Sequence, residues 1–261
     1  MPENIKSFKI SNQKPYSELG DEWNLLADLR YEQLSGDRDV TFSRLICPHI
    51  LDFLLKEKPK TVLDIGCGTG ILSNTIARCG IKTVGIDISS RSIEIAAKTA
   101  HENATFDVKS LEEYVRNDAQ TFGAAVANMV LMNVYDLLPF LLAVNRSIDL
   151  GSCFVYSITH PCFWPQFCGY DSELWHSYSQ RESIEGPFMI SSEPDKVGRS
   201  THVHRPLADY LNSFFRAGFV SEILLEPMPS DDIKKLYPYT WRHPRYIIGL
   251  LRKISEPKYA I

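Results

Sequence analysis

The spacing of hydrophobic and polar residues predicts a helical segment at the start of the chain. Residues 1–16 are polar and contain two prolines, which favours a loose arm. Two helices are expected next, over residues 17–35 and 43–57. The second has one apolar face, formed by Leu45, Ile46, Ile50, Phe53 and Leu54.

From residue 61 the pattern alternates between short apolar runs and helical periods. Strands are predicted over residues 61–65, 82–87, 104–109, 123–131 and 152–159. Helices are predicted over 71–79, after the N-cap candidates Ser89 and Ser90, and over 136–149. Strands that alternate with helices in this way predict a parallel sheet covered on both faces.

After Thr159 the regular pattern stops. Residues 160–203 are rich in aromatic residues, Pro, Gly and Ser, and they show no apolar period of helical length. A helix is predicted again within 205–219, followed by strands over 219–227 and 245–254.

Composition and charge restrict the function classes. The 261 residues are 44% hydrophobic and 23% charged, which is typical of one globular domain. A formal net charge of −4 argues against nucleic acid as the main partner. No apolar stretch approaches the roughly 20 residues that span a bilayer, and no signal segment follows the N-terminus. The six cysteines form no C-x-x-C pair, so we expect free thiols in the cytoplasm and no membrane association.

A glycine-rich turn follows the first predicted strand, in "TVLDIGCGTG". Gly66, Gly68 and Gly70 do not match a P-loop, and the third glycine stands one position too early for the dinucleotide fingerprint. Asp64, at the end of the strand, would repel a pyrophosphate but attract a cation, directly or through water. The cofactor that fits this turn is S-adenosylmethionine, which carries a cationic ammonium and a cationic sulfonium.

The motifs "VLDIGCGTG" and "VGIDIS" resemble those of the class I S-adenosylmethionine-dependent methyltransferases, and the resemblance covers about residues 60–160. It implies that the glycine turn packs under the methionyl part of the cofactor. It also implies that Asp87 binds both ribose hydroxyls, that Ile88 lies against adenine, and that Asn128 meets the methionyl ammonium.

The adenine end of the site stays open at this stage. The alignment puts Ser110, followed by Leu111, where the family usually has an acidic residue, and Asp107 takes that place if the register slips. Families of this kind often fold their N-terminal helices over the cofactor, so Tyr16 or Trp23 is expected to close on the methionyl end.

The expected fold is a single Rossmann-like α/β domain with a seven-stranded, mostly parallel sheet and helices on both faces. We expect an N-terminal arm and helical cap (1–58), a cofactor-binding core (59–159), a lid insertion after strand five (160–203), and a C-terminal helix with an antiparallel strand pair that completes the sheet (204–261).

The acceptor is predicted to be a small molecule. The chain has "NMVL" where methyltransferases of nucleic-acid bases or protein glutamine carry [DN]-P-P-[FY]. Aromatic residues after strand five, including Phe163, Trp164 and Tyr178, form either a pocket for a flat acceptor or the core of the insertion. "THP" and the segment from 204 are similar to a bacterial group of small-molecule methyltransferases of secondary metabolism.

Histidine is the candidate base because its ordinary pKa lies near neutral pH. His160 is the first candidate, followed by His204 and His202, and His202 is also expected to touch the acceptor. The same histidines with Cys162 have the residue types of a zinc site, but the spacing supports no metal, and none is predicted.

The sequence therefore predicts an enzyme that methylates nitrogen or oxygen of a small aromatic or heterocyclic metabolite, acting as a monomer or homodimer. The alternatives are a methyltransferase of RNA or protein and a non-catalytic methyltransferase-like subunit. A nicotinamide-dependent reductase is the least favoured because of the glycine spacing.

Overall fold

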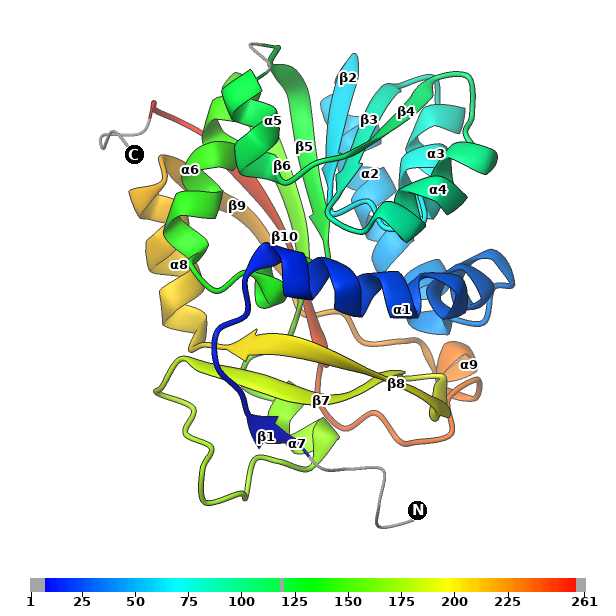
Figure 1. Cartoon of the computed structure of the whole chain (residues 1–261), viewed down its shortest axis with the longest axis vertical. Helices are drawn as coiled ribbons and strands as arrows, with labels where there is room; N and C mark the ends of the chain where they lie inside the picture. Colours follow the sequence, from blue (N-terminus) through cyan, green and yellow to red (C-terminus); the bar gives the residue numbers. More distant parts are fainter. Residues whose placement is uncertain (1–7, 118–119, 257–261) are drawn as a thin grey trace.

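A computed structural model describes residues 8–117 and 120–256 of the protein, and a seven-stranded sheet forms its centre (Figure 1). Its strands are β2 (Thr61–Ile65), β3 (Lys82–Asp87), β4 (Ala104–Val108), β5 (Phe122–Asn128), β6 (Ile148–Thr159), β9 (Phe219–Leu225) and β10 (Tyr246–Lys253). The spatial order is β4-β3-β2-β5-β6-β10-β9, and only β10 runs antiparallel to its neighbours. The predicted seven-stranded, mostly parallel sheet is confirmed.

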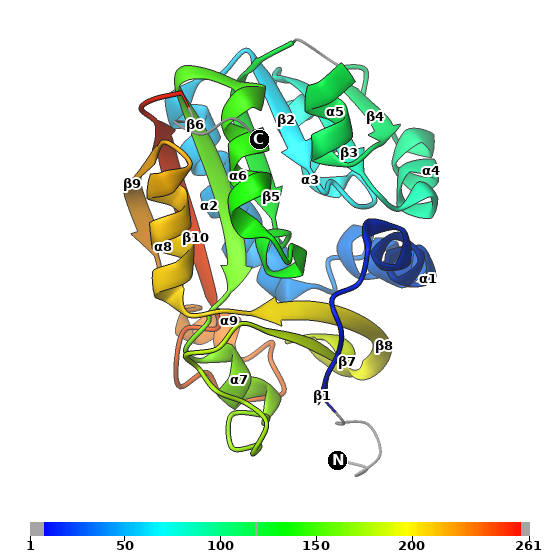
Figure 2. The same ribbon diagram turned by 60° about the vertical axis from the view of Figure 1, so that its left-hand side comes forward.

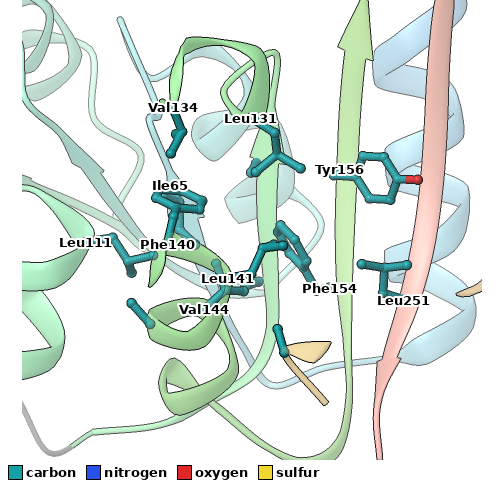
Figure 3. Close-up of a cluster of buried hydrophobic side chains, with 14 of the residues drawn as sticks. Ile65, Leu111, Leu131, Val134, Phe140, Leu141, Val144, Phe154, Tyr156 and Leu251 are labelled. Carbon is teal, nitrogen blue, oxygen red and sulfur yellow. The ribbon is translucent and has the colours of Figure 1, made fainter. Parts of the chain in front are cut away.

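Helices cover both faces of this sheet. The helices around the sheet include α2 (Cys47–Glu57), α3 (Ile71–Arg78), α4 (Ser90–Lys98), α5 (Leu111–Asn117), α6 (Leu137–Ser147) and α8 (Leu207–Arg216). A π-helical turn at Phe42–Ile46 leads into α2, and α2 and α3 pack on one face of the sheet. Helices α5, α6 and α8 pack on the other face, where Phe140 and Phe154 belong to the larger hydrophobic cluster (Figure 3). Continuous burial on both faces explains the apolar runs of the parallel strands.

A second, three-stranded sheet lies apart from the first. It contains β1 (Lys9–Ile10), β7 (Glu182–Ile190) and β8 (Glu193–His204), in the order β1-β7-β8. The short helix α7 (Trp164–Cys168) precedes β7 in the chain. Strands β7 and β8 form an antiparallel hairpin. A further short helix, α9 (Asp231–Lys234), lies between β9 and β10.

Helix α1 (Tyr16–Ser35) lies between the two sheets, as Figures 1 and 2 show from two directions. It passes close to the end of β3, because a side chain on Gly20 would lie 3.1 Å from the Ile88 carbonyl oxygen. It also packs tightly on the hairpin, where a side chain on Gly198 would lie 2.1 Å from Leu26 Cδ2. Glu22 accepts hydrogen bonds from the backbone and hydroxyl of Thr201 at 3.0 and 2.9 Å. The helix is therefore fixed to both sheets.

Several segments differ from the sequence prediction. The insertion contains the β7–β8 hairpin and α7, although its apolar pattern predicted no regular element. Part of the predicted loose arm forms β1, which pairs with β7, and residues 1–7 of that arm lie outside the described residues. The fourth strand ends at Asn128 because Met129 has a left-handed backbone conformation with φ of 60°. The helix predicted to end at 149 ends at Ser147, where β6 begins directly.

Candidate cofactor and acceptor site

One cavity of about 270 Å³ lies between the two sheets and is partly covered by α1. The large sheet and its loops contribute most of the predicted cofactor residues, namely Gly66, Gly68, Asp87, Ile88, Ser110, Leu111 and Asn128. Helix α1 contributes Tyr16, Trp23 and Arg30. The insertion contributes a largely apolar wall that includes Trp164, Cys168, Pro187, Phe188 and His202. A cavity beyond the carboxyl ends of parallel strands is the expected ligand position in an open α/β sheet.

The glycine turn brings backbone, not side chains, to the cavity. Gly66 and Gly68 have φ values of 67° and 54°, which residues with a Cβ rarely adopt. A side chain on Gly66 would lie 2.5 Å from Val130 Cγ2, whereas one on Gly68 would meet no atom within 4 Å. The space beside Gly68 is open for a ligand, so the residues present fit a cofactor that packs directly against the chain.

Asp87 is fixed at the end of β3 by two backbone groups. Gly68 N donates to its Oδ2 and Ser89 N donates to its Oδ1, each at 2.8 Å. Burial raises the pKa of this carboxyl, and the backbone hydrogen bonds oppose that rise. Both oxygens keep further lone pairs beyond these two bonds, which a ligand hydroxyl can use.

Asp64 and Gly70 support the turn from behind and do not line the cavity. Asp64 is 1% exposed, and Ser73 Oγ donates to its Oδ2 at 2.5 Å. Burial, with a contribution from Asp87, raises the pKa of Asp64 to about 7. Gly70 precedes α3, and a side chain there would lie 2.8 Å from atoms of Ala96 and Phe106.

Ser110 and Leu111 begin α5 at the cavity wall. Ser110 N donates to Glu113 Oε2 at 3.0 Å and Glu113 N donates to Ser110 Oγ at 3.2 Å, which is a capping box. The other sequence candidate, Asp107, does not line the cavity and forms an ion pair with Lys109 at 2.7 Å. The structure therefore brings Ser110 and Leu111, and not Asp107, to the cavity wall.

Asn128 lies at the end of β5, beside an unusual backbone residue. Ser157 Oγ donates to Asn128 Oδ1 at 2.7 Å, and Met129 N donates to the Ser157 carbonyl at 3.0 Å. The left-handed conformation of Met129 is costly for a residue with a side chain and is typical of functional sites. No signal in the sequence indicated it.

Helix α1 is tied across the cavity at its N-terminal end and near its middle. Tyr16 Oη donates to Glu112 Oε1 on α5 at 2.9 Å, and burial with the nearby carboxylates raises the pKa of Tyr16. Asn24 Oδ1 accepts hydrogen bonds from Ser89 Oγ at 2.9 Å and from Arg91 N at 3.0 Å. Tyr16 and Trp23 both line the cavity, and Tyr16 is held against α5 beside Leu111.

The two histidines proposed as bases are not among the residues that line this cavity. His160 Nδ1 accepts a hydrogen bond from Cys162 N at 3.1 Å, and its Nε2 donates to Glu226 Oε1 at 2.6 Å. His204 Nε2 donates to the Tyr178 carbonyl at 3.1 Å, and burial lowers its pKa. Both nitrogens of His160 have partners within the protein, and neither histidine lines the cavity, so their placement does not favour a role as base.

The remaining acceptor candidates divide into two groups. Trp164 and His202 line the cavity, whereas Phe163 and Tyr178 do not. Phe163 stacks on His243 with ring centres 4.9 Å apart. Tyr178 Oη accepts a hydrogen bond from Leu207 N at 3.1 Å.

Sequence reasoning missed other wall residues, including Phe42, Phe188 and Tyr246, because they come from distant segments. It also missed Arg30, whose guanidinium lies 5.3 Å from the centre of the Phe188 ring and donates to Asp39 at 3.1 Å. Within residues 8–117 and 120–256, no group of three or more His, Cys, Asp or Glu side chains is arranged to hold a metal ion.

Comparisons with known proteins agree with this geometry. The signature of a methyltransferase domain matches residues 38–184, more than half of the chain. The chain belongs to this methyltransferase family. The predicted class I S-adenosylmethionine-dependent methyltransferase is therefore confirmed, and S-adenosylmethionine is the cofactor of the family's chemistry.

The human mitochondrial ubiquinone biosynthesis O-methyltransferase is 38% identical over 132 residues, which are 42% of this chain and 35% of that protein. A bacterial ubiquinone biosynthesis O-methyltransferase from Actinobacillus pleuropneumoniae is 32% identical over 110 residues. The chain therefore spans about a third of the length of the human relative and about half of the length of the bacterial one.

Solved structures show the same fold. An S-adenosylmethionine-dependent methyltransferase from Clostridium acetobutylicum has a TM-score of 0.59 at 15% identity, covering 88% of this chain and 98% of that one. The 1,6-didemethyltoxoflavin-N1-methyltransferase of Burkholderia thailandensis has a TM-score of 0.61 at 13% identity and covers 98% of both chains. In the part of the chain that the structure describes, no helix is long and apolar enough to cross a membrane.

Proposed function

We propose that this methyltransferase transfers a methyl group from S-adenosylmethionine to nitrogen or oxygen of a small aromatic or heterocyclic molecule. The observation that carries the proposal is one cavity in which the glycine turn and Asp87 share a space with an aromatic wall. The similarity to an O-methyltransferase of ubiquinone biosynthesis supports an acceptor of this size and chemistry.

The wall from the large sheet has the groups that the cofactor needs. Asp87 offers carboxylate oxygens to the ribose hydroxyls, and Ile88 and Leu111 offer apolar surface to the adenine ring. Asn128 lies at the end of β5, where it would meet the methionyl ammonium, and Gly68 leaves room for close backbone contact. When bound, S-adenosylmethionine supplies an electrophilic methyl group on a sulfonium.

The wall from the insertion and α1 would align the acceptor and exclude water. Methyl transfer is an in-line displacement, so holding both reactants at a fixed distance contributes a large part of the rate. Trp164, Phe188 and Trp23 present flat apolar surfaces, and Trp23 packs edge-on against Phe188 with ring centres 5.6 Å apart. Such a wall suits a planar acceptor better than a flexible polar one.

The size of the cavity and the charge of the chain favour a small acceptor over RNA or protein. The proposal includes a monomer or homodimer, no nucleic-acid partner, and a cytoplasmic location in which the six cysteines stay reduced. The insertion at 160–203 is proposed to act as the lid and 59–159 as the cofactor-binding core.

The test is calorimetric titration of the purified protein with S-adenosylhomocysteine. The wild type is expected to bind, and Asp87→Ala is expected to lose about 1–3 kcal/mol of binding free energy because hydrogen bonds to a charged group are lost. Asp107→Ala is the matched control, since Asp107 lies on the neighbouring strand β4 and outside the cavity wall.

Unchanged affinity in Asp87→Ala would contradict the proposed ribose contact, and a loss in Asp107→Ala would restore the other alignment of the adenine end. No binding by the wild type would favour the non-catalytic subunit. Tight, salt-dependent binding of RNA would favour a macromolecular acceptor.

A further inference from the structure

His202 is a histidine of the cavity wall with a free ring nitrogen. It lies on β8, lines the cavity, and is half-buried. Its Nε2 is 3.1 Å from Tyr170 Oη. Among the described residues, no partner lies within hydrogen-bond distance of its Nδ1. One nitrogen therefore orients the ring, and the other remains available to a ligand.

Tyr170 holds this ring rigidly. It is 1% exposed and stacks on Trp175 with ring centres 5.7 Å apart. Phe8 lies 4.9 Å from Tyr170 and 6.3 Å from His202, measured between ring centres. A base whose second nitrogen is oriented by a fixed partner has the arrangement used in many acyl- and group-transfer sites.

Burial, together with the ionisable groups around it, keeps His202 neutral. His176, His204 and Tyr170 lie around it, and the carboxylate of Glu182, which acts on His204 and Tyr170, is occupied by His176 Nδ1 at 2.8 Å. Burial and, to a smaller extent, the neighbouring His204 and His176 lower the pKa of His202 to about 4. A neutral imidazole offers one lone pair, and at Nδ1 it is available if Nε2 donates to Tyr170 Oη.

We propose that the acceptor carries a ring hydroxyl and that His202 Nδ1 accepts its hydrogen bond and then its proton, with Tyr170 as the positioning residue. This inference rests on the proposed function. As the hydroxyl oxygen forms a bond to the methyl carbon, its proton moves to Nδ1 and the electron pair of the sulfur–carbon bond stays on sulfur. The products are the methyl ether and S-adenosylhomocysteine, and His202 releases the proton to solvent afterwards.

His202 is paired with the phenol of Tyr170 and not with a carboxylate, and this pairing determines which kind of hydroxyl group it can deprotonate. His160 and His176 each pair with a carboxylate, which would stabilise a positive ring, and His202 does not. A base without that support is weak, so its acceptor must lose its proton readily. Aromatic hydroxyls meet this requirement, whereas aliphatic alcohols do not. The aromatic cavity wall can also accommodate a planar aromatic ring.

The test measures binding of two probes, 4-nitrophenol and nitrobenzene, to the full chain saturated with S-adenosylhomocysteine. The probes share a ring and differ by the hydroxyl. The wild type is expected to prefer 4-nitrophenol about three- to tenfold, the effect of one hydrogen bond. His202→Phe is expected to lose the preference and Tyr170→Phe to reduce it. His243→Gln is the matched control, since His243 is exposed and lies outside the cavity wall.

A second measurement makes its main comparison on the wild type, so that this comparison does not depend on the folding of a variant. With ¹⁵N-labelled histidine, 4-nitrophenol is expected to shift one Nδ1 resonance that nitrobenzene leaves in place, and Tyr170→Phe is expected to move the same residue's Nε2 resonance.

Equal affinity of the wild type for both probes, binding of neither, or an intact preference in His202→Phe would overturn the inference, as would an unmoved Nδ1 spectrum. None of these results affects the proposed function if S-adenosylhomocysteine binds. Failure to bind S-adenosylhomocysteine would instead overturn the proposed function itself.

Discussion

The buried carboxyl of Asp64 makes the stability of the protein depend on pH. Asp64 lies under the glycine turn, is 1% exposed, and has Ser73 Oγ as its hydrogen-bond donor. Its pKa rises from 3.8 to about 7, mainly because burial disfavours the charged form and also because Asp87 is nearby. We predict that this one group destabilises the folded protein as the pH rises from about 4 to about 7.

The sign follows from proton binding. In the unfolded chain the carboxyl loses its proton near its ordinary pKa, whereas in the folded protein it keeps the proton until about pH 7. The folded state therefore binds more protons in this window, and the free energy of unfolding falls as the pH rises. Each tenfold change in the proton equilibrium is worth about 1.4 kcal/mol, so the whole effect is at most about 4 kcal/mol and is complete above about pH 7.

The assay compares urea unfolding of the wild type and Asp64→Asn between about pH 4 and pH 8. Other carboxyl groups, such as Glu94 and Glu185, have lowered pKa values and give the opposite slope, so the difference between the two proteins is the measured quantity. Asp64→Asn is expected to gain about 2–4 kcal/mol relative to the wild type across this range. Asp52→Asn, at an exposed carboxyl on α2, is the control.

A constant difference between wild type and Asp64→Asn at every pH would refute the reasoning, because it would mean that Asp64 titrates alike in the folded and unfolded states. If the wild type instead gained stability relative to Asp64→Asn as the pH rose, Asp64 would be stabilised as a carboxylate, as a bound cation would require.

Three glycine substitutions test how the cavity is built. Gly66→Ala is expected to lose about 2 kcal/mol of unfolding free energy, measured by thermal unfolding, since alanine would have to adopt a left-handed backbone conformation and its Cβ would meet Val130. Gly68→Ala is expected to lose about 1 kcal/mol but to weaken S-adenosylhomocysteine binding about tenfold in calorimetry, because its Cβ enters the space beside the loop; unchanged binding would place the ligand elsewhere. Gly198→Ala is expected to lose about 1–3 kcal/mol by displacing Leu26 from the hairpin, and a fully stable variant would contradict the packing of α1.

The wall formed by the large sheet was predictable because its signals are local. Gly66, Gly68 and Asp87 lie within 22 consecutive residues that directly follow β2 and have the pattern of turn, helix and strand. Parallel strands bring their carboxyl ends to one edge, so Asn128 at the end of β5 had to lie near Asp87 at the end of β3. The sequence order of such elements determines their place in the sheet with few alternatives.

Asp64 shows the limit of this local reasoning. The pattern located its carboxyl at the strand end correctly but said nothing of its direction. In β2 successive side chains point to opposite faces, and the side chain of Asp64 points under α3 to Ser73. Charge alone suggested a cation contact, whereas the direction of the strand residue decided otherwise.

The wall formed by the insertion was not predictable because it is assembled from contacts between distant residues. Gly186 and Pro187 interrupt the apolar pattern of β7, and both are explained only by the fold. A side chain on Gly186 would lie 2.1 Å from the Phe8 ring, a residue almost 180 positions away. Hairpin signals that depend on such a partner cannot be read in a local window.

The sequence could not show which histidine lines the cavity, because this also depends on contacts between distant residues. Their residue type gave the chemistry of a base, but burial and partners decide which of them faces the ligand. His160 and His204 have structural partners at the edge of the insertion, whereas His202 faces the cavity. In an extended strand His202 and His204 share a face, yet the strand ends at His204 and only His202 reaches the space under α1. The position of a strand end, a property of the whole fold, thus separates the residue available to the acceptor from the residue held by the protein.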